Sequence, residues 1–233
     1  MIMETDVTLS IHPSEARRPH PALLLLILWC VAVLAFLLIG TGAIWLRSWG
    51  PARPLIYPVV SSRMMPTINT GDIVLGAMYT VQEPKPRRGD IVLHNASWRG
   101  SRWFVISRVV GLPGDKVQLV SGRLHINQKL VPREPVEDYA AADFYNRMVP
   151  SYRETFSDGL NHLIVETEED RSPWDNTPVI HVPEGKVFVL GDNRDNSMDS
   201  RTEVGAVPIS DIRGYPILIL WSEDRSRIGS VPR

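Results

Sequence analysis

The chain has 233 residues, with 25 Lys and Arg against 26 Asp and Glu, so its formal net charge is −1. At about 150 residues per domain, this length allows one substantial domain and an appendage. The near-neutral charge gives no electrostatic reason to expect a nucleic-acid partner. The single cysteine, Cys30, excludes an intrachain disulfide framework and a cysteine-based zinc site.

An uninterrupted apolar segment without any charged residue occupies residues 22–46. A helix of this length rises roughly 37 Å, which exceeds the ~30 Å hydrocarbon core of a bilayer. The segment is also longer than the ~7–15 apolar residues typical of a cleavable signal peptide. We therefore predict a permanent transmembrane anchor at residues 22–46, preceded by an N-terminal tail at residues 1–21. The flanking arginines are nearly balanced and do not decide its orientation.

From residue 57 onward the sequence changes to short β-branched runs separated by Gly, Pro and Asp. Many short strands with turn signals between them indicate an all-β sandwich or barrel rather than βαβ units. The predicted fold class is mainly β over residues 57–233, within which residues 131–180 form an insertion or small subdomain. No long amphipathic helix is expected there. The predicted strands are residues 72–75, 90–93, 103–106, 116–120, 162–165, 186–190 and 216–221.

Four stretches, taken together and in order, resemble the sequence boxes of bacterial type I signal (leader) peptidases. They are SSRMMPTI at residues 61–68 followed by GDIVL, RGDIV at 88–92, SRVVGLPGDKV at 107–117 and GDNRDNSMDSR at 191–201. The resemblance implies a signal-peptidase-like β-rich extramembrane domain on a single N-terminal transmembrane helix. It also implies a serine endopeptidase scaffold that removes signal peptides from exported preproteins by Ser/Lys hydrolysis.

The same resemblance implies where the protein works and what it contacts. The expected location is the bacterial cytoplasmic membrane, crossed once, with the N-terminus in the cytoplasm. The β domain then lies on the outer, periplasmic or extracellular, face. The expected partners are signal peptides of exported preproteins and cytoplasmic membrane lipid, with no nucleic acid. No cofactor and no metal are expected.

Both positions of the family's catalytic dyad are substituted in this chain. The register of MMPT places Arg63 at the nucleophile position, and the motif leading into GLPGD places Ser107 at the general-base position. A guanidinium has a pKa above about 12 and is neither a nucleophile nor a base near neutral pH. The chain has four lysines, none within eight residues of Ser107: Lys85, Lys116, Lys129 and Lys186. We therefore predict that native Ser/Lys catalysis is lost. We also expect Arg63 to weaken binding of neutral, small-residue peptides.

Two alternatives remain open at this stage. One is an active signal peptidase with a relocated nucleophile, Ser61 or Ser62, and a histidine base. In an extended stretch Ser62 would point to the face opposite Arg63. The histidines considered are His94, His125, His162 and His181, none of which has a triad-like sequence context. The other alternative is a non-proteolytic subunit that binds preproteins or another partner.

The resemblance assigns roles to further residues. Ser61 corresponds to the oxyanion-hole position, Ser197 to the residue that supports the base, and Asp199 and Arg201 to a structural pair in the loop. We interpret three other loop residues as holding a local turn by side-chain to backbone hydrogen bonds: Asp192, Asn193 and Asp195. A calcium loop is excluded because Arg194 occupies a position that requires an oxygen ligand. Residues 111–115 are predicted to form a tight turn.

Overall fold

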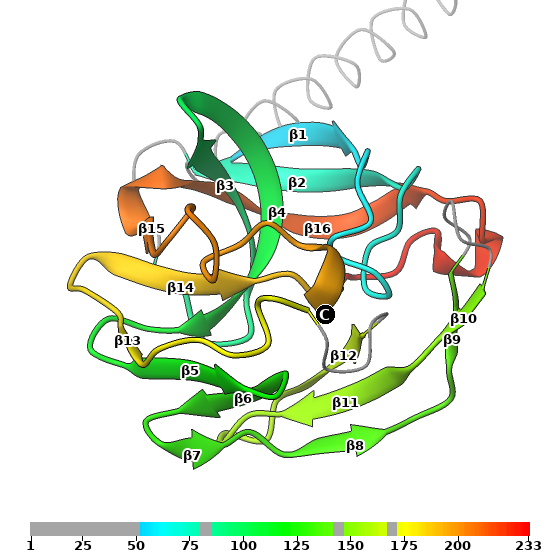
Figure 1. Cartoon of the computed structure of the whole chain (residues 1–233). Coiled ribbons are helices and arrows are strands. Elements are labelled where there is room, and N and C mark those ends of the chain that lie inside the picture. Colours follow the sequence, from blue (N-terminus) through cyan, green and yellow to red (C-terminus); the bar gives the residue numbers. More distant parts are fainter. Residues whose placement is uncertain (1–51, 80–84, 142–146, 167–171) are drawn as a thin grey trace, which may run out of the picture. The chain divides into compact units, whose positions relative to one another are not determined.

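The computed structural model describes residues 52–79, 85–141, 147–166 and 172–233 (Figure 1). The chain divides into two units, residues 1–50 and 51–233. The predicted tail and anchor, residues 1–21 and 22–46, lie outside the described residues. Within the described ranges, no helix is long and apolar enough to cross a membrane.

The largest element is a seven-stranded antiparallel sheet with the strand order β1-β2-β16-β3-β4-β14-β15. Its C-terminal strand, β16, inserts between β2 and β3, so the two ends of the domain's sequence meet in one sheet. The strands are β1 (Ala52–Pro58), β2 (Ile73–Tyr79), β3 (Ile91–Trp98), β4 (Ser101–Gly111), β14 (Lys186–Leu190), β15 (Val207–Pro208) and β16 (Ile212–Trp221).

Three smaller sheets lie below and beside the large one in Figure 1. The first contains β13 (Ile180–His181), β5 (Lys116–Val120), β6 (Arg123–Ile126) and β7 (Lys129–Leu130). The second contains β12 (Asn161–Val165), β11 (Ser151–Thr155) and β8 (Arg133–Pro135), and the third pairs β10 (Arg147–Val149) with β9 (Tyr139–Ala141). In the described part of the chain the only helices are short 3-10 turns: η1 (Arg194–Asn196), η2 (Ile209–Asp211) and η3 (Arg225–Arg227).

The mainly β prediction is confirmed, and each of the seven predicted runs overlaps a strand. The β3–β4 hairpin shows why the sequence folds in this way. Its two turn residues, Arg99 and Gly100, both have positive φ (47° and 78°), as the tightest hairpin turns require. The turn fixes the register, which pairs Val92 with Ser107. Both faces of this hairpin are covered near its base, so its apolar runs are continuous rather than alternating.

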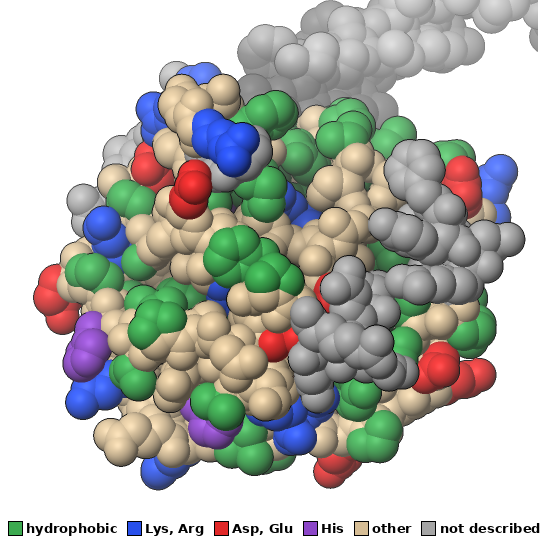
Figure 2. Space-filling view, in the orientation of Figure 1, with side chains coloured by type: hydrophobic (Ala, Val, Ile, Leu, Met, Phe, Trp, Pro, Cys, Tyr) green, Lys and Arg blue, Asp and Glu red, His purple; other side chains and the backbone are tan. Residues whose placement is uncertain are grey.

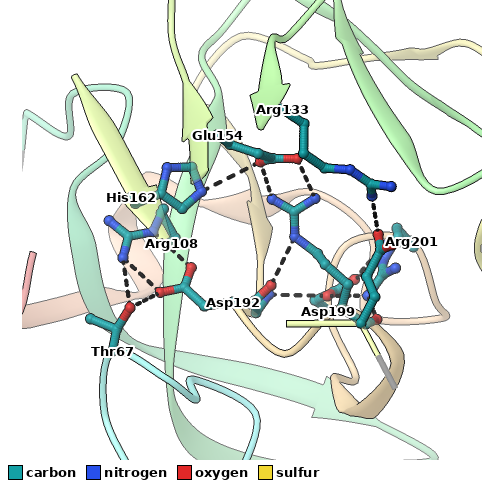
Figure 3. A network of polar contacts seen from close by, with 11 residues as sticks. Thr67, Arg108, Arg133, Glu154, His162, Asp192, Asp199 and Arg201 are labelled. Carbon is teal, nitrogen blue, oxygen red and sulfur yellow. Dashed lines mark hydrogen bonds and ion pairs between the residues drawn. The ribbon is translucent and has the colours of Figure 1, made fainter. Parts of the chain in front are cut away.

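A buried ion pair connects β4 to the loop that follows β14. The guanidinium of Arg108 donates through Nε to Asp192 Oδ1 (2.7 Å) and through Nη2 to Asp192 Oδ2 (2.6 Å), and both side chains are 1% exposed. Arg108 Nη1 also donates to the carbonyl oxygen of Gly89 (2.8 Å), and the hydroxyl of Thr67 donates to Asp192. Three loops from distant parts of the sequence are thus held by one cation and one anion (Figure 3).

The expectation that Asp192 and Asn193 hold a local turn is therefore wrong. Asp192 accepts from Arg108, 84 residues away in sequence, and Asn193 Nδ2 donates to the carbonyl oxygen of Ser62 (3.2 Å). Burial alone would raise the pKa of Asp192, but the charge and hydrogen bonds of Arg108 outweigh it and hold that pKa below its usual range.

A second buried cluster fixes the same loop to the sheet that contains β11. Arg194 forms a two-pronged ion pair with Glu154, and His162 Nε2 lies 3.4 Å from a Glu154 oxygen (Figure 3). Burial alone would raise the pKa of Glu154, but the charge of Arg194 dominates and lowers it to about 2. Strands from residues 131–180 therefore brace the loop at residues 191–201.

The Arg108–Asp192 pair gives a stability prediction. Asp192→Asn removes the carboxylate but leaves the buried guanidinium, so the free energy of unfolding should fall by about 3–5 kcal/mol. The matched control is Asp211→Asn, because Asp211 pairs at 3.1 Å with Arg102, whose side chain is 62% exposed. That change should cost less than about 1 kcal/mol. Urea denaturation of the full chain measures both, and equal losses would contradict the central role of the buried pair.

Candidate functional site

An apolar groove of about 380 Å³ lies beside β4. Its wall is made almost entirely of hydrophobic side chains, and its polar contributors are Tyr57, Ser61 and Arg63. Figure 2 shows hydrophobic side chains in several separate places on the face in view, with many of the charged side chains toward its margins. The apolar lining residues are Val59, Val60, Met64, Ala96, Trp103, Phe104, Val105, Ile106, Met198 and Val204.

One side of the groove is an open strand edge. Strand β4 pairs with β3 from Ser101 to Arg108, and β14 pairs only with its last part, beginning where Leu190 meets Arg108. Among the described residues, positions 101–107 of β4 therefore have no second neighbouring strand. Such an edge presents unpaired backbone groups to an extended chain. The hydroxyl of Tyr57 donates to one of them, the Phe104 carbonyl oxygen (3.0 Å).

Residues 59–61 and Arg63 also line the groove. Val59 is held by backbone hydrogen bonds to Asp72 and Gly71 (both 2.8 Å), and the carbonyl oxygen of Arg63 accepts from Asn193 N (2.9 Å). Arg63 begins a turn that continues to residue 67, so the stretch is not extended through Arg63. This differs from the arrangement expected if the whole stretch were a strand, because Met65 N bonds back to the Ser62 carbonyl oxygen (3.0 Å).

The side chain of Arg63 places a cation in this apolar groove. Its Nη1 donates to the carbonyl oxygen of Met198 (3.3 Å), and no carboxylate of the described residues lies within ion-pair distance. The nearby Asp199 is already bonded to Arg201 at 2.9 Å. Burial lowers the pKa of Arg63, while the charge of Asp199 raises it. The guanidinium nevertheless stays protonated at neutral pH, because an arginine side chain is far too basic to lose its proton there.

Ser107 does not open into the groove; it forms a buried hydrogen bond with His94. His94 Nε2 lies 3.0 Å from the Ser107 hydroxyl, His94 Nδ1 lies 3.2 Å from the Asn95 carbonyl oxygen, and both residues are 1% exposed. Since the Asn95 oxygen is an acceptor only, Nδ1 carries the proton and Nε2 accepts from Ser107. Burial lowers the pKa of His94 to about 4, and the charge of Arg63 contributes to the shift.

The other serines singled out in the sequence have different surroundings. Ser61 is exposed and lines the groove. The hydroxyl of Ser62 accepts from Asn196 Nδ2 (2.7 Å). The hydroxyl of Ser197 is buried and has no hydrogen-bond partner within the described residues. Neither Ser61 nor Ser62 has a hydrogen bond to a histidine or lysine of that part of the chain.

The loop residues pack closely around Arg63. A side chain at Gly191 would place its Cβ 2.3 Å from the Ser197 hydroxyl and 2.6 Å from the Arg63 carbonyl oxygen, so only glycine fits there. Asp199 Oδ2 accepts from the backbone N–H of Gly191 (3.1 Å) and from Arg201 (2.9 Å). These contacts do not involve Ser107, and the Arg63 side chain adds one more through its hydrogen bond to Met198.

The sequence reasoning missed the contact between His94 and Ser107. The signal that could have found it is the Arg99-Gly100 turn, because a two-residue turn there pairs Val92 with Ser107. His94 is two residues after Val92 on β3, so its side chain lies on the same face of the sheet as those of Val92 and Ser107. It is therefore the diagonal neighbour of Ser107. The structure thus places His94 next to Ser107, although the sequence context of His94 is not triad-like.

The buried His94 gives a pH prediction. Its pKa is about 4 in the folded protein against 6.5 when unperturbed, so the unfolded chain binds more protons between these values. The contribution of the neutral His94 to the free energy of unfolding is fully present above about pH 6.5. As the pH falls toward 4, that free energy should decrease by up to about 3 kcal/mol. Urea denaturation at several pH values should show a smaller loss in His94→Gln than in the unaltered chain.

A control separates this effect from general acid sensitivity. His162 is also buried with a lowered pKa, so part of the slope should persist in His94→Gln. The exposed His181 provides a matched substitution, and His181→Gln should keep the full loss. Identical slopes in His94→Gln and His181→Gln would contradict the assignment of a buried, neutral His94.

Comparison with known proteins agrees with the order of the sequence boxes. A family model described as signal peptidase, peptidase S26, matches residues 26–221. A protein named signal peptidase I from Rickettsia typhi (strain ATCC VR-144 / Wilmington) is 38% identical over 143 residues, covering 59% of this chain and 53% of that protein. Another from Rickettsia massiliae (strain Mtu5) is 41% identical over 133 residues, covering 53% of this chain and 47% of the other.

The chain spans about half the length of these curated relatives. A solved structure of a signal peptidase I from Enterococcus faecalis V583 is 29% identical, covers 57% of this chain and 98% of its own, and has a TM-score of 0.33. The family model covers most of the sequence, including all four boxes. The chain therefore belongs to the signal peptidase, peptidase S26, family.

Proposed function

We propose that this protein is a membrane-anchored type I signal peptidase homologue that has lost Ser/Lys catalysis and retains a peptide-binding groove. The observation that carries the proposal is the pair of side chains at the predicted dyad positions. Arg63 extends a guanidinium into the groove, and Ser107 is buried against His94. Neither position offers a nucleophile activated by a base on the groove surface.

The chemistry of peptide hydrolysis explains why these side chains do not substitute for the dyad. A serine must lose its proton to a base as it attacks the carbonyl carbon, and a lysine serves only when it is neutral. Arg63 remains charged, and Ser107 has no basic nitrogen of its own. The hydroxyl of Ser197, which has no hydrogen-bond partner among the described residues, supports the proposal, because the resemblance implies that this position supports the lysine.

The proposed ligand is an extended segment with small or apolar side chains, such as a signal peptide of an exported preprotein. It would add to the open edge of β4, with main-chain hydrogen bonds giving affinity and the apolar wall giving selectivity. The proposed location is the outer face of the bacterial cytoplasmic membrane, with residues 22–46 as the anchor and the N-terminus in the cytoplasm.

One observation favours a second candidate function, hydrolysis with Ser107 as a relocated nucleophile. The hydroxyl of Ser107 donates to His94 Nε2, which is the arrangement a general base requires. The burial of both side chains, at 1% exposure, and the low pKa of His94 weigh against it. A fluorophosphonate probe tests it, since this function requires a covalent adduct on Ser107 that His94→Gln abolishes.

The principal prediction concerns the dyad. The double variant Arg63→Ser/Ser107→Lys should cleave a preprotein at its signal-peptide junction, because it restores a nucleophile and a base in the retained scaffold. The unaltered chain should give no cleavage under the same conditions. Mass spectrometry of the products, with detergent-solubilised full-length protein, measures both.

The two single variants are the controls. Arg63→Ser has a serine without its lysine, and Ser107→Lys has a lysine without its serine, so each should cleave at least about 100-fold more slowly than the double variant. Cleavage by the unaltered chain would overturn the loss of catalysis, and loss of that cleavage in Ser107→Ala would then favour the second candidate.

A further inference from the structure

We infer that the groove beside β4 binds peptides by their free C-terminal carboxylate, which pairs with Arg63. The ligand class is an extended peptide with small apolar side chains that ends at this point, such as a peptide already released by proteolysis. This inference rests on the proposed peptide-binding function and specifies which end of the peptide the site recognises. Four features of the groove carry it.

The first feature is where the open edge stops. A strand added beside β4 can pair along residues 101–107, but beyond them Leu190 of β14 already pairs with Arg108. The loop after β14 closes the same end, because Asn193 N bonds to the Arg63 carbonyl oxygen (2.9 Å) and Gly191 packs against it. An extended peptide therefore has to end or turn away at this point.

The second feature is the position of Arg63 at that closed end. Arg63 and Ile106 both line the groove. The positive charge of Arg63 also helps to lower the pKa of His94, whose ring is hydrogen-bonded to Ser107, the residue after Ile106. The opposite end of the groove is formed by Ala96 and Trp103, near the hairpin turn. The cation thus lies where a bound chain would stop rather than midway along it.

The third feature is the bonding capacity of the guanidinium. It has five N–H donors, of which one is used by the carbonyl oxygen of Met198 (3.3 Å). None of its nitrogens is among the buried atoms without a partner in the described residues, so the remaining donors face accessible space. A carboxylate accepts two parallel hydrogen bonds from such a group, which a neutral carbonyl does not.

The fourth feature is charge, which selects the direction of the peptide. A strand parallel to β4 would bring its C-terminus to the closed end, whereas an antiparallel strand would bring its N-terminus there. A terminal ammonium next to Arg63 would be repelled, and a terminal carboxylate would be attracted in a wall that is otherwise apolar. The site therefore favours a parallel peptide with its carboxylate at Arg63.

Binding of matched peptides tests the inference. The probe is an acetylated, fluorescently labelled hexapeptide of alanine, valine and leucine that ends in alanine, made as the free acid and as the C-terminal amide. Fluorescence anisotropy with the full chain in detergent should show about 10- to 100-fold tighter binding of the acid. Arg63→Gln should remove the difference between the two, and Arg63→Lys should keep part of it.

The matched control is Arg153→Gln, because Arg153 is an exposed arginine on β11 outside the groove lining. It should keep the full preference for the acid. Equal binding of acid and amide by the unaltered chain, or a preference that survives in Arg63→Gln, would overturn the inference while leaving the proposed peptide-binding function intact.

Two further outcomes are also decisive. Binding of neither peptide would overturn the proposed function itself, and the inference with it. An amide whose last residue is glutamate supplies a side-chain carboxylate in place of the terminal one. If this glutamate-ending amide binds as tightly as the free acid, the inference that Arg63 recognises the C-terminal carboxylate of the peptide is wrong.

Discussion

The buried pair of Arg108 and Asp192 is the interaction on which the rest of the site depends. Its guanidinium and carboxylate are joined by two hydrogen bonds at 2.7 and 2.6 Å, with both side chains 1% exposed. Thr67 and the Gly89 carbonyl are bonded to the same two groups, so three loops converge on them. A buried pair of this kind contributes little net stability, but loss of either partner is costly, so it specifies one arrangement of the loops.

The same arrangement determines which contacts hold the loop beside Arg63 and Ser107. Ser107 and Arg108 are consecutive on β4, so their side chains point to opposite faces of the sheet. The contacts that fix the loop at residues 191–201 come from Arg108, Glu154 and Arg201, on the side away from Ser107 or within the loop. The backbone and the side chain of Arg63 also bond to this loop, whereas Ser107 bonds to His94 instead.

The sequence predicted some of this and not the rest, for identifiable reasons. The seven predicted strands have strong apolar runs bounded by turn residues, and all of them form. Nine strands were not predicted. Six of them have only two or three residues each, too few to show a period: β7, β8, β9, β10, β13 and β15. The other three are the longer β1, β6 and β11, with seven, four and five residues. The loop chemistry at Asp192 was predicted as local because Asp commonly stabilises turns. Its true partner lies 84 residues away, and no spacing rule reveals such a contact. The His94–Ser107 contact was accessible through the hairpin register, since it depends only on a two-residue turn.

The most direct test of the account is backbone hydrogen exchange of the full chain with and without the free-acid peptide. We expect slower exchange at residues 103–107 of β4 and at residues 59–63, because a peptide held between them supplies the missing strand. Exchange on β11, which lies outside the groove, should not change. Unchanged exchange along the open edge of β4, with protection elsewhere or none at all, would contradict the assignment of this groove as the peptide-binding site.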